Sequence, residues 1–457
     1  MMTESQRAAL AEYAAVKGQC PARERLAALF DDGVYTETGS NLRAGENLAG
    51  VVTAYGYIGG TPAYAFSQDS TVMKGAVSLA HSAKICKMFE LAARNGVPVV
   101  GIYDSCGAFV EDGADALNAY SDILLSMGSL SGVVPMVSVI SGVCAGTMAM
   151  IASSADFSVI TEGAELYLDA SGNNASAESA AKSGAVSAYA KSDAEAMDTV
   201  RRYLSLMPQN NLSPLPEFEF DAPVSAAFDN AENAAESIAD AGSILEVYGE
   251  YGTASYTALC TVSGVTAGIA ATNKTKDKLT SADCSKIARF VRLCDAYSIP
   301  VITVADTEGF DLHGADMVRA GAALAGAYAE ASCAKIALVS GKACGMAYIA
   351  FAGRNVAADA VYVLPEAVIA PMDPVSAAEF LYHDKLKGAD DLAAARAQIA
   401  KEYAENEGSA FAAAAKGAAD EVVTAENVRA AVASVLDVTA GKRLNKRLPK
   451  KHNILPL

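Results

Sequence analysis

The spacing of hydrophobic and polar residues predicts alternating helices and strands, the order typical of an α/β protein. Apolar side chains recur at helical spacing over residues 78–95, and Asn95-Gly96 ends this helix before an apolar strand over 97–103. The same order returns later, where residues 281–298 are predicted to form a helix and residues 300–305 a strand. The pattern therefore indicates that one structural unit occurs twice.

A residue-by-residue comparison supports this duplication. Tyr103-Asp104-Ser105-Cys106-Gly107 matches Ala305-Asp306-Thr307-Glu308-Gly309 at an offset of 202 residues. A second shared block, 141–146 and 340–345, follows at an offset of 199. We therefore predict two tandem domains. Their expected bounds are 1–222 and 223–457, with the boundary marked by Pro208, Pro214, Pro216 and Pro223.

The other predicted elements complete this picture. The first two helices are expected to form an N-terminal arm, and the alanine-rich helices after Pro371 close the chain. Residues 171–192 are rich in Ala, Ser, Gly and Asn, which predicts an exposed connector. Further helices are predicted over 3–16, 21–33, 147–154, 193–207, 316–331, 390–419 and 425–436, and further strands over 51–55, 63–66, 133–140, 256–262, 265–271 and 336–339.

Four glycine-containing turns follow predicted strands, and each is expected to open a helix. Amide groups at such a turn lack partners inside the helix, so they suit an anion or a developing oxyanion. A single turn of this kind is weak evidence, because small residues also let a helix pack on a strand. The duplication strengthens the signal for two facing oxyanion holes. The turns are Ser105-Cys106-Gly107-Ala108, Cys144-Ala145-Gly146-Thr147, Thr307-Glu308-Gly309 and Cys344-Gly345-Met346-Ala347.

Charge and composition argue against two classes of protein, those that bind nucleic acid and those that span a membrane. The 457 residues include 35 Lys and Arg against 53 Asp and Glu, a net charge of -18, which argues against a nucleic-acid partner. Basic residues gather only near the C-terminus, where they form either a solvated tail or a phosphate contact. No charged residue lies between Asp122 and Asp156, but Pro135 and several glycines favour a buried strand, turn and helix over a membrane span.

The positions of the cysteines and histidines limit which disulfides, metal sites and catalytic groups the chain can form. None of the nine cysteines forms a Cys-x-x-Cys pair and no signal peptide is evident, so we expect a reducing, cytoplasmic location without disulfides. Four scattered histidines give no zinc site and no Ser-His-Asp array. Asp311, His313 and Asp316 carry ligand atoms, but we expect no metal. Cys106 and Cys344 lie in the turns without a neighbouring histidine to activate them, so we expect neither to be a nucleophile.

At these segments the chain resembles the biotin-dependent acyl-CoA carboxyltransferase family of the crotonase superfamily, and the resemblance runs nearly end to end. The matching segments are Ala22-Arg23-Glu24-Arg25-Leu26, Phe66-Ser67-Gln68-Asp69, Ala83-Lys84-Ile85-Cys86-Lys87, Ser131-Gly132-Val133-Val134-Pro135, Gly142-Val143-Cys144-Ala145-Gly146, Ala288-Arg289-Phe290-Val291-Arg292, Asp306-Thr307-Glu308-Gly309-Phe310, Ala327-Tyr328-Ala329-Glu330-Ala331, Lys342-Ala343-Cys344-Gly345, Ala358-Asp359-Ala360-Val361-Tyr362 and 449–457.

The resemblance implies a fold of two crotonase-like ββα spirals and a carboxyl transfer between biotin and the α-carbon of a short acyl-CoA. Backbone amides would supply the catalysis. By position, Gly146 and Thr147 would face the acyl-CoA carbonyl, and Met346 and Ala347 the biotin carbonyl. The remaining residues implied to line the ligands are Gly107, Ala108, Ala145, Gly309, Phe310, Gly345 and Ile349.

The resemblance also implies partners. Acyl-CoA would enter from the N-terminal domain and biotin from the C-terminal domain of a neighbouring subunit, which requires at least a dimer and allows a hexamer. The chain has no Met-Lys-Met biotin acceptor, so a separate biotin carrier protein is expected, together with a biotin carboxylase or a membrane decarboxylase subunit.

The chain departs from the family pattern at the two places that matter most. Thr147 and Met346 stand where members usually carry a second glycine, and Phe109 replaces an arginine of the first turn. Ile349 stands where many members have a polar residue in the acyl pocket. Two alternatives therefore remain open: a non-catalytic subunit for assembly or acyl-CoA binding, and a hydratase or isomerase of the wider superfamily.

Overall fold

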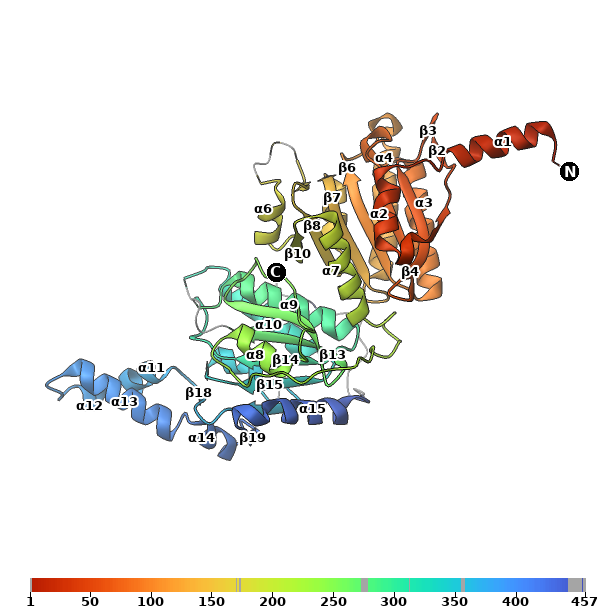
Figure 1. Cartoon of the computed structure of the whole chain (residues 1–457). Coiled ribbons are helices and arrows are strands. Elements are labelled where there is room, and N and C mark those ends of the chain that lie inside the picture. The colour runs from red at the N-terminus through yellow and green to blue at the C-terminus, as the bar shows by residue number, and fades with distance from the viewer. Residues whose placement is uncertain are drawn as a thin grey trace. The chain divides into compact units, whose positions relative to one another are not determined.

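The computed structural model describes residues 2–169, 171, 174–272, 278–311, 313–354, 358–442 and 454. It divides into two compact units, Met1–Pro214 and Leu215–Leu457, which Figure 1 shows in red to yellow-green and in green to blue. Unit 2 begins before residue 222 because Glu217 already bridges to Val265 and the Phe218 amide donates to the Gly264 carbonyl at 2.8 Å. The basic residues 443–451 lie outside the described part of the chain.

Unit 1 is built on one mixed sheet in the order β1-β4-β5-β6-β7-β8-β10, with β9 paired to β7. The glycines at 59 and 60 turn the chain between β4 and β5, so these strands pair antiparallel. From β5 to β10 the pairing is parallel, because each connection crosses the sheet. The strands are β1 Tyr35–Thr38, β4 Val51–Ile58, β5 Thr61–Gln68, β6 Val99–Ser105, β7 Met136–Ala145, β8 Phe157–Thr161, β9 Glu165–Tyr167 and β10 Ala188–Ala190, and a separate ribbon pairs β2 Arg43–Ala44 with β3 Asn47–Leu48.

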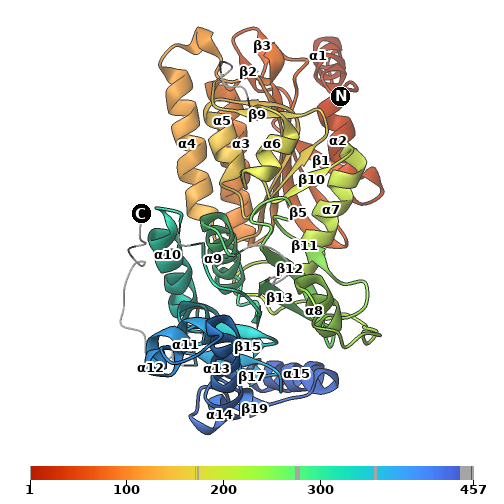
Figure 2. The ribbon, with the colours of Figure 1, turned by 90° about the vertical axis from the view of Figure 1, so that its left-hand side faces the viewer.

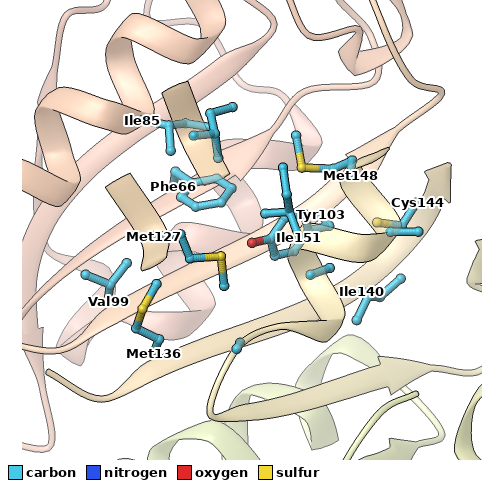
Figure 3. Packing of buried hydrophobic residues seen from close by; sticks show 14 of the residues in the cluster. Phe66, Ile85, Val99, Tyr103, Met127, Met136, Ile140, Cys144, Met148 and Ile151 are labelled. Atoms are coloured by element: carbon cyan, nitrogen blue, oxygen red, sulfur yellow. The ribbon is translucent and has the colours of Figure 1, made fainter. Parts of the chain in front are cut away.

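Helices cover both faces of this sheet. Figure 2 shows α3 and α4 on one face and α2 and α7 on the other. Under α3 and α4 lies an apolar core in which Phe66 meets Phe89 and Tyr103 edge to face (Figure 3). None of the residues in α1 is buried. The helices are α1 Glu4–Ala15, α2 Pro21–Leu29, α3 Leu79–Asn95, α4 Asp115–Leu130, α5 Thr147–Ser153, α6 Ala177–Lys182 and α7 Asp193–Leu206.

Unit 2 repeats this architecture in a sheet of order β11-β12-β13-β14-β15-β17-β19, with β16 and β18 paired separately. It too begins antiparallel and becomes parallel after β13. Its strands are β11 Leu245–Glu246, β12 Ser255–Val262, β13 Val265–Thr272, β14 Val301–Ala305, β15 Lys335–Val339, β16 Lys342–Cys344, β17 Ala360–Val363, β18 Val368–Ala370 and β19 Glu421–Val422. Its helices are α8 Ala231–Ile238, α9 Ser281–Ala296, α10 Met317–Glu330, α11 Pro374–Leu381, α12 His383–Leu386, α13 Leu392–Asn406, α14 Ala410–Ala415 and α15 Val428–Thr439, with a short helix over Tyr348–Ala352.

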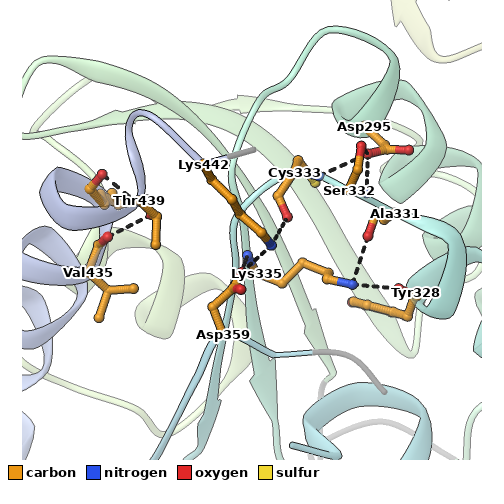
Figure 4. A network of polar contacts seen from close by, with 11 residues as sticks. Asp295, Tyr328, Ala331, Ser332, Cys333, Lys335, Asp359, Val435, Thr439 and Lys442 are labelled. Carbon is orange, nitrogen blue, oxygen red and sulfur yellow. Dashed lines mark hydrogen bonds and ion pairs between the residues drawn. The ribbon is translucent and has the colours of Figure 1, made fainter. Parts of the chain in front are cut away.

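A polar network fixes the start of β15 (Figure 4). The ammonium group of Lys335 donates to the carbonyl oxygens of Tyr328 and Ala331 at 2.7 and 2.9 Å. Burial lowers the pKa of Lys335. The Asp359 carboxylate accepts from the Lys335 amide at 2.8 Å and from the Lys442 ammonium at 2.7 Å, so the chain after α15 is tied to the sheet.

The structure corrects several elements predicted from the sequence. Residues 171–192 are not an exposed connector, because they contain α6, whose alanines pack on the core at helical spacing, and β10, which extends the sheet. The strand predicted to end at Ile140 continues to Ala145, and Gly142 lies inside it. In the described residues, no helix is both long and apolar enough to cross a membrane.

Helix α3 buries a histidine and a lysine. His81 is fully buried, its Nε2 lies 3.2 Å from Gln68 Nε2, and burial, with the nearby Lys84 charge, lowers its pKa to about 3. The Lys84 ammonium donates to the Val51 carbonyl, and burial lowers its pKa to about 8. The Gln68 Oε1 accepts from the Asp104 amide, so Gln68 Nε2 donates to an unprotonated His81 Nε2.

This burial predicts a pH dependence of stability. The unfolded chain protonates His81 as pH falls through about 6.5, whereas the folded protein resists protonation until about pH 3. The stability that neutral His81 contributes is therefore present above about pH 6.5 and is lost as pH falls. Chemical unfolding between pH 5 and 6.5 should show a slope smaller by up to ~1.4 kcal/mol per pH unit in His81→Gln. The exposed His383→Gln is the control and should keep the wild-type slope, and equal slopes in all three proteins would contradict the account.

Candidate active site

Two neighbouring strand ends form the candidate site of unit 1. β6 and β7 run parallel, and Tyr103 pairs with Ile140 while Ser105 pairs with Cys144. Two steps along β6 therefore correspond to four along β7, which places a bulge at Ser141-Gly142-Val143. Beyond the bulge the two chains leave the sheet side by side as the turns after Ser105 and Cys144.

A buried carboxylate occupies the bulge. A Cβ atom on Gly142 would lie 2.3 Å from Asp104 Oδ1, so only glycine leaves room for this side chain. Asp104 Oδ2 accepts from Arg25 Nη1 at 2.9 Å and from Ser70 Oγ at 2.8 Å. The arrangement repeats in unit 2, where a Cβ atom on Gly341 would lie 2.3 Å from Asp306 Oδ1.

The first turn of each unit has the same hydrogen bonds. In unit 1 the Gly107 amide donates to Ser105 Oγ at 3.3 Å, and Ala108 forms a parallel bridge with Val77. In unit 2 the corresponding donor is the Gly309 amide, 3.1 Å from Thr307 Oγ1, and Phe310 forms the bridge with Leu279. The sequence predicted that each of these turns opens a helix. Neither does so directly, because α4 begins only at Asp115 and α10 at Met317.

The second turn of each unit does lead into a helix. Gly146 has φ 65° and ψ -138°, a conformation that only glycine adopts easily, and its amide donates to the Tyr167 carbonyl at 2.9 Å. The Gly345 amide donates in the same way to the Ala370 carbonyl at 2.9 Å. Both glycine amides are thus engaged in holding the turn, and the next residues begin the helices.

Several backbone amides at these turns have no acceptor among the described residues. Among the described residues, no protein acceptor takes a hydrogen bond from the amides of Ala108 and Thr147 in unit 1, or of Phe310 and Met346 in unit 2. Bridges to Val77 and Leu279 use the groups on either side of Ala108 and Phe310, so those two amides point away from the bridge. Within the described ranges, each unit therefore presents at least one unpaired amide from each of two adjacent turns.

The other residues predicted to line the ligands differ in how far they are exposed to solvent. Ala145 and Ala347 are buried beside the second turns, whereas Met346 and Ile349 expose about half of their side chains, at 58% and 53%. The Met346 side chain is exposed to solvent, and its backbone lies in the helical residues that directly precede the helix Tyr348–Ala352. Within the ranges that the structure describes, no group of three His, Cys, Asp or Glu side chains is arranged to hold a metal ion.

Charged groups differ between the two halves. The Lys342 ammonium contacts the carboxylates of Glu308, at 2.6 Å, and Asp373, and these carboxylates raise the pKa of Lys342. Asp373 also caps α11. The matching positions of unit 1 are the neutral Cys106 and Val143. Sequence analysis missed this ion-pair cluster, and it missed Arg25 as well, although Arg25 lies in one of the matched segments.

Among the described residues, the cysteines near the turns have no histidine partner to activate them. Cys106 is exposed, and Cys344 is half-buried with a pKa that burial raises. A raised pKa keeps the thiol protonated and therefore a poor nucleophile.

The two-unit fold with duplicated amide turns defines a crotonase-like α/β carboxyltransferase. The model of the carboxyl transferase domain family matches residues 14–455. The chain belongs to this family and is a carboxyltransferase of the biotin-dependent acyl-CoA carboxylase and decarboxylase type, which confirms the resemblance seen in the sequence.

Particular relatives cover nearly all of the chain. The methylmalonyl-CoA decarboxylase subunit alpha of Propionigenium modestum is 33% identical over 96% of this chain and 94% of its own length. The methylmalonyl-CoA carboxyltransferase 12S subunit of Propionibacterium freudenreichii subsp. shermanii is 33% identical over 96% of this chain and 92% of its own. The crystal structure of transcarboxylase 12S, a hexamer with hydrolysed methylmalonyl-coenzyme A bound, matches with a TM-score of 0.91 at 30% identity and covers 100% of both chains.

The contact between Asp104 and Gly142 predicts an intolerant position. Gly142→Ala would force its new methyl group into the carboxylate and should lower the free energy of unfolding by about 3 kcal/mol. Gly128→Ala, on the exposed face of α4 with open space around it, should instead gain about 0.5–1 kcal/mol. Chemical unfolding measures both changes, and a Gly142→Ala protein as stable as wild type would contradict the contact.

Proposed function

We propose that this chain is the subunit that moves a carboxyl group between biotin on a separate carrier and the α-carbon of a short acyl-CoA. The supporting observation is the duplicated pair of unpaired amides, Ala108 with Thr147 and Phe310 with Met346. This pattern favours Ala108 over Gly146 as the donor beside Thr147, because the Gly146 amide is engaged by the Tyr167 carbonyl, and it adds Phe310 as a donor beside Met346 and Ala347.

The chemistry needs stabilisation of negative charge on oxygen. Cleavage of the bond between the α-carbon and the carboxyl group of a malonyl-type thioester leaves an electron pair that the thioester oxygen takes up as an enolate. Two fixed amide donors lower the free energy of this oxyanion, because they are oriented before the charge develops. Neither a histidine nor a thiolate is required. The Ala108 and Thr147 amides of unit 1 would hold the thioester oxygen.

The second pair would hold the carbonyl oxygen of biotin. Bound biotin supplies the ureido nitrogen that accepts or donates the carboxyl group. Phe310 and Met346 suit its carbonyl oxygen, because neither amide has an acceptor among the described residues and a ureido carbonyl requires donors. Gly107, Gly309, Ala145 and Gly345 shape the turns. We assign acyl-CoA to unit 1 and biotin to unit 2, the order implied by the resemblance.

Exposed apolar residues support a homo-oligomer. Leu117 and Val318 directly follow the first buried residues of α4 and α10, and they are 67% and 86% exposed. Met150 and Ile349, which follow the second turns, occupy matching positions of the two units and are each 53% exposed. Apolar residues that stay exposed in both copies indicate a surface that another subunit covers. We propose that unit 1 of one chain faces unit 2 of another, as part of a dimer or of a hexamer like that of the 12S relative.

The wider assembly is proposed from the relatives. A biotin carrier protein would bring biotin to unit 2, and a biotin carboxylase or a membrane decarboxylase subunit would complete the complex. The relative from Propionigenium modestum is the alpha subunit of a methylmalonyl-CoA decarboxylase. The cytoplasmic location stays a prediction from the sequence.

Proline substitution at Thr147 tests the amide directly. Thr147 is the first residue of α5, a position where proline fits the backbone but removes the N–H group. With malonyl-CoA or methylmalonyl-CoA and free biotin, wild-type protein should release CO₂ slowly. Thr147→Pro should lower kcat about 100- to 1000-fold. Thr147→Ala keeps the amide and should retain most of the rate.

The same pair of substitutions at Met346 tests the biotin half. Met346→Pro should lower kcat and Met346→Ala should not. Proline variants as active as wild type would exclude amide catalysis at these turns. Complete inactivity of wild-type protein with every acyl-CoA, accompanied by normal oligomers, would favour an assembly subunit instead.

A further inference from the structure

Arg25 connects four segments of unit 1. Its Nη1 donates to Asp104 Oδ2 at 2.9 Å, at the end of β6, and its Nη2 donates to the Ser141 carbonyl at 3.0 Å, in the bulge of β7. Its Nε donates to Asp193 Oδ2 at 3.3 Å, at the start of α7. Arg25 itself lies on α2 and is largely buried. One planar group thus satisfies three acceptors from different parts of the chain.

The bulge leaves a carbonyl and a carboxylate that need hydrogen-bond donors, and Arg25 supplies these donors. The register shift between β6 and β7 takes the Ser141 carbonyl out of the regular ladder, and the glycine at 142 admits the Asp104 carboxylate. A buried carbonyl and a buried carboxylate both cost free energy when they lack donors. A guanidinium group supplies donors to both in a fixed geometry, which an ammonium group on a flexible stem does not.

The groups that Arg25 holds directly precede the two turns. Asp104 is followed by Ser105, which anchors the Gly107 amide, and Ser141 begins the bulge that carries β7 toward Gly146. A shift at either place moves the turn that follows it. In unit 2 the corresponding carboxylate of Asp306 accepts from a backbone amide, that of Lys342, at 2.9 Å.

We propose that Arg25 is a positioning residue for the acyl-CoA half of the reaction: through Asp104 and Ser141 it sets the separation of the Ala108 and Thr147 amides. This inference rests on the proposed function. It assigns Arg25 no contact with substrate and no proton transfer. Loss of the guanidinium therefore acts on the geometry of the amide pair.

The same helix offers a matched control. Arg23 forms an equally buried fork with the Glu37 carboxylate, with Nε and Nη2 each 3.0 Å from an oxygen. Breaking that ion pair removes the same kind of interaction from α2 but leaves the bulge intact. Arg25→Met and Arg23→Met should therefore cost similar stability, and only Arg25→Met should disturb the turns.

The test compares Arg25→Met, Arg25→Lys and Arg23→Met in the full chain, well below their unfolding temperatures. Arg25→Met should lower kcat for malonyl-CoA decarboxylation about 10- to 100-fold with little change in KM for free biotin, because the misplaced groups are amides of unit 1. Arg25→Lys should recover part of this loss. Arg23→Met should stay close to wild type.

Hydrogen exchange gives a readout that does not depend on activity. The Phe109 amide donates to the Val77 carbonyl and the Gly146 amide to the Tyr167 carbonyl, so their exchange reports the two turns. Both should exchange at least ~10-fold faster in Arg25→Met and at the wild-type rate in Arg23→Met. Equal exchange and equal kcat in the two Met variants would overturn the proposal. If wild-type protein is inactive, the proposed function fails, while hydrogen exchange still decides whether Arg25 positions the turns.

Discussion

The site depends on one contact, that of a buried carboxylate with a strand that has no Cβ atom at the point of closest approach. Asp104 lies over Gly142 and Asp306 over Gly341, and each pair stands where two parallel strands leave the sheet. Any larger residue at the glycine would collide with the carboxylate, and loss of the carboxylate would leave a gap in the bulge. Because this contact recurs in both units, the duplicated halves keep the same turns although most of their residues differ.

From this contact the rest of the site follows in order. The bulge directs two successive turns to one edge of the sheet. The amides of Gly146 and Gly345 are engaged by the carbonyls of Tyr167 and Ala370, which come from the short strands β9 and β18. In the proposed function the donors are the neighbouring amides, which every residue type except proline supplies. Under that proposal Thr147 and Met346 can stand where the resemblance implies glycine.

Much of the fold was predictable, because amphipathic periodicity marks α3 and α9 and apolar runs mark β6 and β14. The duplication and the glycine turns were also visible in the sequence, and the amides of the proposed site lie in these turns. The engagement of the Gly146 amide was not predictable, since its acceptor Tyr167 carries no local signal. Arg25 and the link from His81 to Asp104 were missed for the same reason: their partners are distant in sequence. The prediction of a connector over residues 171–192 was wrong because small residues pack a core helix as readily as they form a connector.

The central claim is that fixed amides of unit 1 polarise a thioester carbonyl. Infrared difference spectroscopy of an acyl-CoA labelled with ¹³C at its thioester carbonyl, bound to wild-type protein and to Thr147→Pro, tests this claim most directly. The account predicts a carbonyl stretch shifted to lower frequency on binding to wild type, and a clearly smaller shift in the proline variant. A bound thioester whose carbonyl frequency equals that in water, or one that is shifted equally in both proteins, would contradict it.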